Sequence, residues 1–309
     1  MTELNLEEHT FAKFVDNVQQ IWDTSSLDAF LKCPQYYKLN TIEGWKISSE
    51  SIDPLWGSAI HDAFEVLDTN RFKGNKKDEA INEAIHLLIT KYGALQYSDN
   101  TKKNLETACR AVVWRADEHY YSDTAKIMPL PNGEPALEVR FELPFEDTGY
   151  RFSGRIDKVV TLNDQLFIVD TKTTASSLSN YYFDRYAPAN QIYTYIWATR
   201  EQLGLPVAGF IIDAVSTGVN FTRFGRQQFN VRESQINEWI RSVKYQLKCV
   251  EDFHTIEEWP RNFAGCGNYG GCSYRDICRN APEHRQAFLD AEFKLAPYGT
   301  RVTTEKENT

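Results

Sequence analysis

Two stretches of the chain each end in an aspartate, and a lysine lies two residues after the second aspartate. The first stretch runs from Tyr150 to Asp157, and the second runs from Leu166 through Asp170 to Lys172. In a β-strand alternate side chains share a face, so Asp170 and Lys172 should project to the same side. The pattern predicts two neighbouring strands that carry two carboxylates and one ammonium group at their ends.

A turn between these strands would bring the carboxylates together. Asn163 and Asp164 stand at the centre of the intervening segment, and both residue types favour the tight turn of a hairpin. Two hard oxygen ligands at one place suit Mg²⁺ or Mn²⁺. A neighbouring lysine can stabilise negative charge on a phosphate or orient an attacking water. Together they predict metal-assisted hydrolysis of a phosphodiester, although an Asp-x-Lys triplet alone also occurs on ordinary strand ends.

Three further polar residues lie on predicted helices that flank the two strands. His61 follows Gly57 and Ser58 near the start of a helix whose apolar residues recur at helical spacing. Downstream, Gln191 and Tyr195 are four residues apart and therefore share one face of a helix. A lone histidine is more often structural than a metal ligand. These three residues therefore indicate a site only in combination with the acidic strands that lie between them in the sequence.

The six cysteines predict a second site. Cys266, Cys272 and Cys278 lie close together, and Cys33 lies far upstream. Glycines around the first two let the backbone wrap an ion or cluster, and four thiolates suit either a [4Fe–4S] cluster or a structural zinc ion. A disulfide is a weaker interpretation because nothing in the sequence suggests export. Two cysteines lie in or beside apolar helix faces and need no functional role, Cys109 and Cys249.

The order and spacing of these pieces resemble the RecB-like branch of the PD-(D/E)xK nuclease superfamily, in particular its iron–sulfur members. That group includes the CRISPR-associated RecB-like exonucleases, the nuclease domains of AddB-type helicase–nucleases and phage relatives. The resemblance extends over about residues 24 to 280, nearly the whole chain. Its matching pieces are the segment 25–37 around Cys33, Gly57 to His61, Gly154 to Asp157, Asp170 to Lys172, Gln191 with Tyr195, and the last three cysteines.

The resemblance implies a role for each matching residue. The metal ligands would be His61, Asp157, Asp170 and the carbonyl of Thr171. The catalytic residues would be Lys172, Asp170 and Asp157, with Gln191 and Tyr195 completing the site and contacting the nucleic acid. The cluster ligands would be Cys33, Cys266, Cys272 and Cys278. The last three follow a C-x5-C-x5-C pattern, whereas relatives commonly use C-x2-C-x5-C, and this departure leaves zinc open.

Composition limits the classes of protein and partner. The chain has 309 residues and a formal net charge of −9, which argues against indiscriminate binding to nucleic acid but permits a local basic cleft. Arg155, Arg275 and Arg279 are the expected DNA contacts. No apolar run approaches the length of a membrane span, and the acidic N-terminus is unlike a signal peptide. A cytoplasmic protein in a reducing compartment is therefore expected.

The pieces fit a single α/β nuclease domain over residues 1–297. The resemblance implies a restriction-endonuclease-like mixed sheet core in the order αβββαβ. A helical insertion at about 62–125 and a cysteine clamp would complete it, with the clamp joining Cys33 to 266–278. Residues 1–23 read as a helical or loosely ordered lead-in, Ser25 or Ser26 caps a short helix, and 298–309 read as a disordered tail. The predicted strands are 136–145, 150–161, 165–173, 208–216 and 221–231, and the predicted later helices are 189–203 and 236–250.

The resulting hypothesis is a Mg²⁺- or Mn²⁺-dependent DNA exonuclease that degrades single-stranded DNA from an end. Recombination, repair and CRISPR or phage DNA processing are compatible settings, with a helicase or recombination protein as a partner. One alternative is a non-catalytic iron–sulfur DNA-binding subunit, which the complete Asp157, Asp170 and Lys172 set argues against. Another is an endonuclease of the same fold. Glu138 and Glu142, on the strand before the hairpin, could assist the metal, but solvated strand acids are the favoured interpretation.

Overall fold

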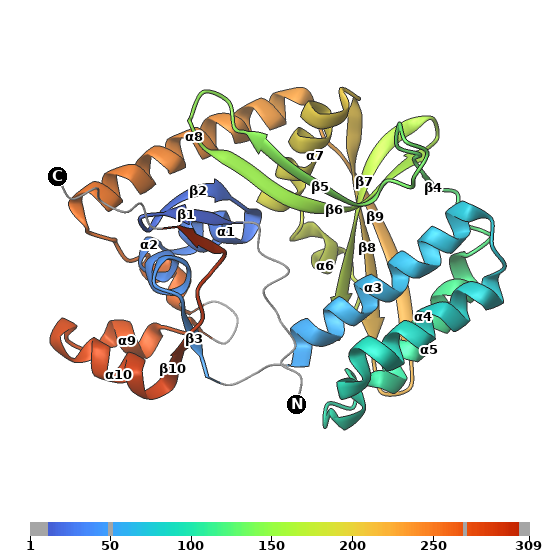
Figure 1. Ribbon diagram of the computed structural model, residues 1–309, viewed down its shortest axis with the longest axis horizontal. Coiled ribbons are helices and arrows are strands. Elements are labelled where there is room, and N and C mark those ends of the chain that lie inside the picture. The colour runs from blue at the N-terminus through green and yellow to red at the C-terminus, as the bar shows by residue number, and fades with distance from the viewer. Residues whose placement is uncertain (1–11, 49–51, 268–270, 303–309) are drawn as a thin grey trace. The chain divides into compact units, whose positions relative to one another are not determined.

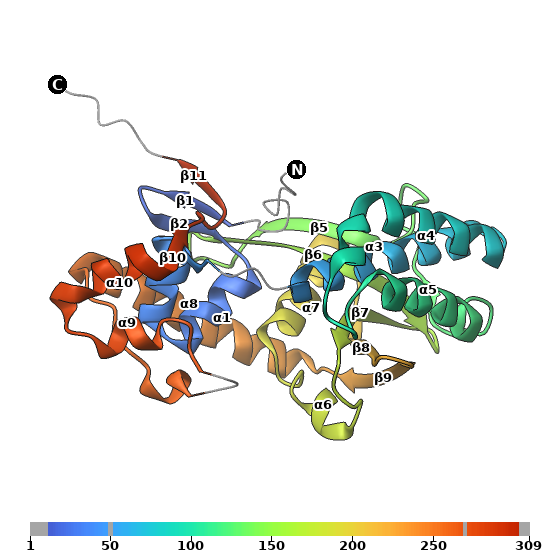
Figure 2. The same ribbon diagram turned by 90° about the horizontal axis from the view of Figure 1, so that it is seen from below.

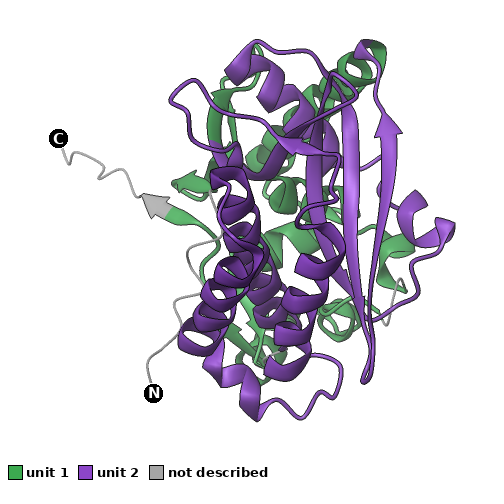
Figure 3. Ribbon diagram, turned by 90° about the vertical axis from the view of Figure 1, so that its right-hand side faces the viewer, with its two compact units in different colours: residues 1–50, 141–154, 234–309 green, residues 51–140, 155–233 purple. Residues whose placement is uncertain are grey.

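The computed structural model describes residues 12–48, 52–267 and 271–302 (Figure 1). The chain divides into two compact units, which Figure 3 shows in different colours. Unit 1 comprises residues 1–50, 141–154 and 234–309, and unit 2 comprises residues 51–140 and 155–233. Neither unit is a continuous stretch of the sequence. The single-domain interpretation of residues 1–297 stays a prediction.

Unit 2 contains a mixed sheet. β6 pairs antiparallel with β7, β7 pairs parallel with β8, and β8 pairs antiparallel with β9. The turn of the β6–β7 hairpin lies at Asn163 and Asp164, whose φ angles of 49° and 62° are both left-handed, as a tight two-residue hairpin turn requires. The strands are β4 (Lys126–Ile127), β5 (Leu137–Pro144), β6 (Arg151–Leu162), β7 (Gln165–Thr174), β8 (Val207–Thr217) and β9 (Thr222–Asn230). The predicted hairpin is thus confirmed.

Helices accompany this sheet in unit 2. Trp56, Ile60 and Phe64 recur at helical spacing along α3 and are buried in an apolar cluster with residues of α4 and α5. Helix α7 is capped at Gly204, whose φ of 64° is the left-handed conformation that glycine favours, and this end agrees with the helix predicted over 189–203. The helices of unit 2 are α3 (Ile52–Lys73), α4 (Lys77–Tyr92), η3 (Gly93–Tyr97), α5 (Leu105–His119), α6 (Asn180–Asp184) and α7 (Asn190–Leu203).

Unit 2 also contains a buried network of charged side chains, here called the charge network. Lys158 Nζ of β6 lies 2.5 Å from Asp68 Oδ2 of α3. Arg115 Nη1 of α5 donates a hydrogen bond of 2.9 Å to Asp213 Oδ1 of β8. The other members are Arg71, Asp123 and Arg226. Buried charges are costly unless they are paired. These ion pairs join helices α3 and α5 to strands β6 and β8 of the sheet.

Unit 1 holds the remaining elements. Its strands are β1 (Lys13–Val15), β2 (Val18–Trp22), β3 (Trp45–Ile47), β10 (Phe293–Leu295) and β11 (Thr300–Val302), together with the first residues of β6 and the last of β5. Its helices are α1 (Thr24–Lys32), α2 (Pro34–Tyr37), η2 (Lys38–Ile42), α8 (Glu233–Ile256, whose first residue belongs to unit 2), η4 (Phe263–Cys266), α9 (Arg275–Arg279), η5 (Pro282–His284) and α10 (Arg285–Glu292).

The beginning of unit 1 differs from the sequence prediction. Residues 13–22 form the hairpin β1–β2 rather than a helical or loose lead-in, and residues 1–11 lie outside the described residues. The cap of α1 is Asp23, not Ser25 or Ser26. Its Oδ1 accepts the Ser26 backbone N–H at 2.7 Å, and the Ser26 hydroxyl in turn accepts the Asp23 backbone N–H. This reciprocal pair fixes the start of the helix at Thr24, with Ser26 at its third position.

The end of the chain also departs from the prediction of a disordered tail over 298–309. Residues 300–302 form β11, which pairs parallel with β1, and residues 303–309 lie outside the described residues. No helix in the described part of the chain is long and apolar enough to cross a membrane. The predicted fold class, an α/β protein with a mixed sheet, agrees with the elements observed.

Candidate functional site

The β6–β7 hairpin opens at the two aspartates. Strand pairing runs from the turn as far as Lys158 with Val169, so Asp157 and Asp170 are the next residues on each strand. Asp157 Oδ2 accepts a hydrogen bond of 2.8 Å from the backbone N–H of Thr171. The acid of β6 is therefore held against β7, and the structure brings the two aspartates together where the strands separate.

Lys172 is engaged from two sides. Its Nζ lies 2.7 Å from Oδ2 of Asp170, which is only 1 % exposed. Burial raises the pKa of Asp170, and the Lys172 ammonium opposes that rise. Burial alone would lower the pKa of Lys172, but the Asp170 carboxylate raises it above its ordinary value. Lys172 is thus held as a cation at neutral pH.

Helix α7 supplies the second contact to Lys172. The ammonium donates to Oε1 of Gln191 at 2.8 Å, and Nε2 of Gln191 donates to the hydroxyl of Tyr195 at 3.1 Å. Burial raises the pKa of Tyr195 well above its ordinary value, so its hydroxyl stays neutral. The four-residue spacing of Gln191 and Tyr195 places them in one hydrogen-bonded chain that ends at the lysine.

His61 and Glu138 join Asp157 on its other side. Nδ1 of His61 lies 3.4 Å from Oδ2 of Asp157, and one ligand atom from each of the three residues lies within 4.8 Å of the others. Glu138 is therefore not a solvated strand acid, which was the favoured interpretation, and its position agrees with the other one, in which it assists a metal. Its φ of 49° is left-handed, a sparsely populated conformation for a non-glycine residue. Asp170 is outside this three-residue group and contacts Lys172 instead.

The local environment of Glu138 is unusual for a strand acid. Burial raises its pKa to about 8, the Asp157 carboxylate adds to the rise, and the Arg155 guanidinium opposes it. Nε of Arg155 lies 2.5 Å from Oε2 of Glu138, so this expected DNA contact is occupied by an acid of the site. Glu142, by contrast, accepts from Nε of Arg151 at 2.8 Å and is half exposed, as expected for an ordinary surface acid.

The donor set fits a divalent cation such as Mg²⁺ or Mn²⁺. Oδ2 of Asp170 and Oε2 of Glu138 are buried and accept no well-aligned hydrogen bond, although each lies beside a cationic side chain. Carboxylate oxygens left without an aligned donor beside an imidazole nitrogen are the ligands that such ions use. His61, Glu138 and Asp157 are the residues closest to a binding arrangement.

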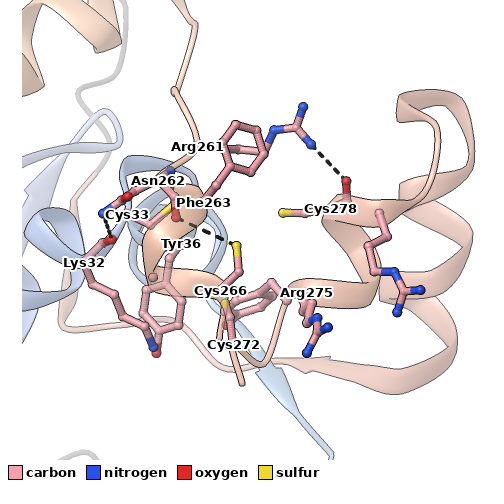
Figure 4. A pocket seen from close by; sticks show the side chains of 13 residues that line it. Lys32, Cys33, Tyr36, Arg261, Asn262, Phe263, Cys266, Cys272, Arg275 and Cys278 are labelled. Carbon is pink, nitrogen blue, oxygen red and sulfur yellow. Dashed lines mark hydrogen bonds between the residues drawn. The ribbon is translucent and has the colours of Figure 1, made fainter. Parts of the chain in front are cut away.

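The four cysteines that the resemblance singled out line one cavity of about 360 Å³ in unit 1 (Figure 4). The backbone N–H of Asn262 donates to Sγ of Cys33 at 3.3 Å, and Sγ of Cys266 donates to the Asn262 carbonyl at 3.8 Å. Burial and then the nearby Cys272 thiolate raise the pKa of Cys278. Arg275 and Arg279 line the same cavity, whereas Cys109 packs against the helical core of unit 2.

The sequence matches the family model of the PD-(D/E)XK nuclease superfamily over residues 22–279. No curated protein has a significant match to the chain. Among solved structures, a crystal structure described as a "putative exonuclease" from Eubacterium rectale has a TM-score of 0.53 and 14% sequence identity. That match covers 85% of this chain and 89% of the other, and it shows a shared fold.

A second solved structure, of SSO0001, has a TM-score of 0.27 and 18% identity over 46% of this chain and 58% of its own. The likeness is too low to support an argument. The family match includes the β6–β7 hairpin, helix α7 and the cysteine segments that the structure gathers into two sites. Its extent over most of the sequence confirms the superfamily that the motifs predicted. The chain belongs to the PD-(D/E)XK nuclease superfamily.

Proposed function

We propose that the protein is a metal-dependent deoxyribonuclease that degrades single-stranded DNA from an end. Membership of the superfamily implies a hydrolytic nuclease with DNA as its substrate. One observation carries the proposal furthest: the opening of the β6–β7 hairpin gathers Asp157, Asp170 and Lys172 beside His61 and Glu138. A non-catalytic subunit would have no need to keep this complete set.

His61, Glu138 and Asp157 would hold the metal, with Asp170 available beside them. A bound Mg²⁺ or Mn²⁺ supplies a Lewis acid for the phosphate and lowers the pKa of a coordinated water. Lys172 contributes positive charge where negative charge develops on the phosphate. Gln191 and Tyr195 orient the ammonium through the chain that leads to helix α7. The Asp157 carboxylate is fixed by the Thr171 N–H, so it need not reorganise during the reaction.

The four thiolates suit a [4Fe–4S] cluster, with structural zinc as the alternative, because Cys33, Cys266, Cys272 and Cys278 line one cavity. We propose that these four thiolates ligate a cluster, and that Arg275 and Arg279 beside it contact DNA. A cytoplasmic setting in recombination, repair or CRISPR or phage DNA processing, with a helicase or recombination partner, is compatible with this activity.

The deciding experiment incubates purified protein with end-labelled linear single-stranded DNA, linear duplex and covalently closed single-stranded circles, each with Mg²⁺, Mn²⁺ or EDTA. We expect linear single strands to be degraded with either metal and to survive in EDTA. Equal cleavage of closed circles would replace the exonuclease assignment by an endonuclease. DNA binding without cleavage under any metal would favour the non-catalytic subunit.

A further inference from the structure

A segment between β7 and α7 carries aromatic and cationic side chains next to Lys172. The centroid of the Tyr186 ring lies 5.8 Å from Nζ of Lys172. The Arg185 guanidinium lies 4.6 Å from the centroid of the Tyr182 ring and 6.0 Å from that of Tyr186. The Tyr186 hydroxyl donates to the Tyr182 hydroxyl at 3.3 Å. A cluster of two rings and one guanidinium therefore continues directly from the catalytic lysine proposed above.

The segment has an inward and an outward side. Tyr182 and Phe183 of helix α6 are buried, whereas Tyr181 is 74 % exposed and Arg185 is also exposed. Figure 2 shows α6 below β8 and β9. The two rings and the guanidinium all lie within residues 182–186, and the Tyr186 ring contacts Lys172. Tyr181 and Arg185 expose their side chains on the outward side.

The segment is anchored to the sheet by a close approach. A Cβ atom at Gly225 of β9 would come within 3.0 Å of Leu178 Cδ1 and 3.3 Å of Phe183 Cζ, so the glycine lets α6 sit against the strand. The Ser216 hydroxyl of β8 donates to the Ser176 carbonyl at 2.7 Å. Contacts with β8 and β9 therefore hold in place the segment that carries the outward side chains.

We propose that Tyr181, Arg185 and Tyr186 form a binding subsite for the unpaired nucleotide next to the scissile phosphate. The proposal rests on the nuclease function and names the form of its substrate, a strand with unstacked bases. A guanidinium matches a phosphate with two hydrogen bonds, and a tyrosine ring offers its face to a base. Paired bases inside a duplex have both faces covered, so the subsite selects single strands or frayed ends.

The test measures binding rather than cleavage. Full-length protein in EDTA is titrated against a fluorescent single-stranded oligonucleotide and against a blunt hairpin duplex of equal length, with anisotropy as the readout. Arg185→Ala and Tyr181→Ala should each weaken single-strand binding about tenfold, as loss of one stacking or phosphate contact implies. Binding to the hairpin duplex should change less than twofold.

Matched variants control for exposure and charge. Tyr121 is also 74 % exposed, and Arg223 is an exposed arginine 4.9 Å from the Phe221 ring, so Tyr121→Ala and Arg223→Ala should each change binding less than twofold. Equal weakening of single-strand and duplex binding by Arg185→Ala would overturn the subsite and leave general electrostatic attraction. Unchanged binding in both subsite variants would overturn it outright.

Tyr186 separates substrate binding from positioning of the lysine. Tyr186→Ala should raise KM for single strands and lower kcat, because the ring contacts Lys172 as well, whereas Tyr186→Phe should retain both. A lower kcat with unchanged KM and unchanged binding in EDTA would make Tyr186 a positioning residue only and remove it from the subsite. Failure of the nuclease assignment is distinguishable, because strand-selective binding without cleavage would refute the nuclease function and leave the subsite standing.

Discussion

Lys172 is where two elements of the proposed active site meet, since Asp170 of β7 and Gln191 of α7 both contact its ammonium. The sequence predicted that Asp170 and Lys172 share a strand face. The spacing of residues alone did not place helix α7 beside the lysine, because that contact depends on how a distant helix docks against the sheet; the family resemblance supplied Gln191 and Tyr195. The same docking places Gln191 and Tyr195, which share a helix face, in the hydrogen-bonded chain that reaches Lys172.

We predict that Lys172→Ala lowers kcat by on the order of a hundredfold or more, because a preorganised positive charge at the developing phosphate charge is lost. Single-turnover rates on labelled DNA measure the effect, and thermal melting verifies that the variant is folded. Lys77→Ala is the matched control, since Lys77 forms an ion pair of 2.7 Å with Asp117 on the surface. Activity close to that of the original chain in Lys172→Ala would remove the lysine from the mechanism.

Glu138 gives a second prediction for a single residue. Glu138→Gln keeps the shape of the side chain and replaces a carboxyl group that can ionise on metal binding by a neutral amide, so Mn²⁺ should bind at least about tenfold more weakly. Calorimetric titration with Mn²⁺ measures this without any DNA. Glu142→Gln, four residues along the same strand, should leave the affinity unchanged. Equal affinities for the two variants would return Glu138 to the role of an ordinary strand acid.

The elements of unit 2 were predictable where local chemistry dominates. The Asn163–Asp164 turn and the Gly204 helix end are set by residues whose own backbone preferences decide the conformation. β1 and β2 were missed because they are short and because β2 pairs with β6, more than a hundred residues away. The left-handed backbone of Glu138 could not be predicted from the sequence either, because tertiary contacts impose that conformation against the local preference of the residue.

The charge network makes the helix–sheet junction of unit 2 sensitive to acid. Burial lowers the pKa of His119 on α5 to about 4, and the Arg115 and Arg226 guanidiniums add to the fall. The Asp213 and Asp123 carboxylates oppose it. In the unfolded chain the imidazole has an ordinary pKa of 6.5. Between pH 6.5 and about 4 the unfolded chain therefore binds a proton at His119 that the folded protein does not bind.

We predict that acid destabilises the protein partly through this histidine. Its contribution is present in full above pH 6.5 and is lost as the pH falls from 6.5 to about 4, at up to about 1.4 kcal/mol per pH unit. Urea unfolding at neutral pH and at two values within this window should show a smaller loss of stability in His119→Phe than in the original chain. Glu118, which is largely exposed, lies 3.6 Å from the imidazole. Identical pH dependence in both proteins would contradict the assignment.

At the scale of the whole molecule, the cysteine cavity joins residues more than two hundred positions apart, because Cys33 and Cys278 line the same space. A cluster that closes so long a loop stabilises the folded chain by restricting the unfolded one. The family resemblance singled out the four cysteines that line this cavity. It left open iron or zinc, because four thiolates suit either.

We predict that anaerobically purified protein is brown, absorbs near about 400 nm and contains iron and sulfide. Cys33→Ser should lose the iron and melt at a lower temperature to the same extent as Cys272→Ser, because both ends of the clamp are needed. Cys109→Ser should retain the iron. One zinc and no iron per chain would instead assign a structural zinc site.

The division of the chain into two interleaved units has a consequence for protein synthesis. Every residue of unit 2 precedes residue 234, whereas unit 1 needs Cys266, Cys272 and Cys278. At about 5–20 residues per second, a ribosome delivers the last of these cysteines a few seconds after unit 2 is complete. If unit 2 folds as it emerges, the proposed metal-binding carboxylates come together before the proposed cluster can be acquired. A shortage of iron should then accumulate chains in which the carboxylates have assembled and the cysteine site is empty.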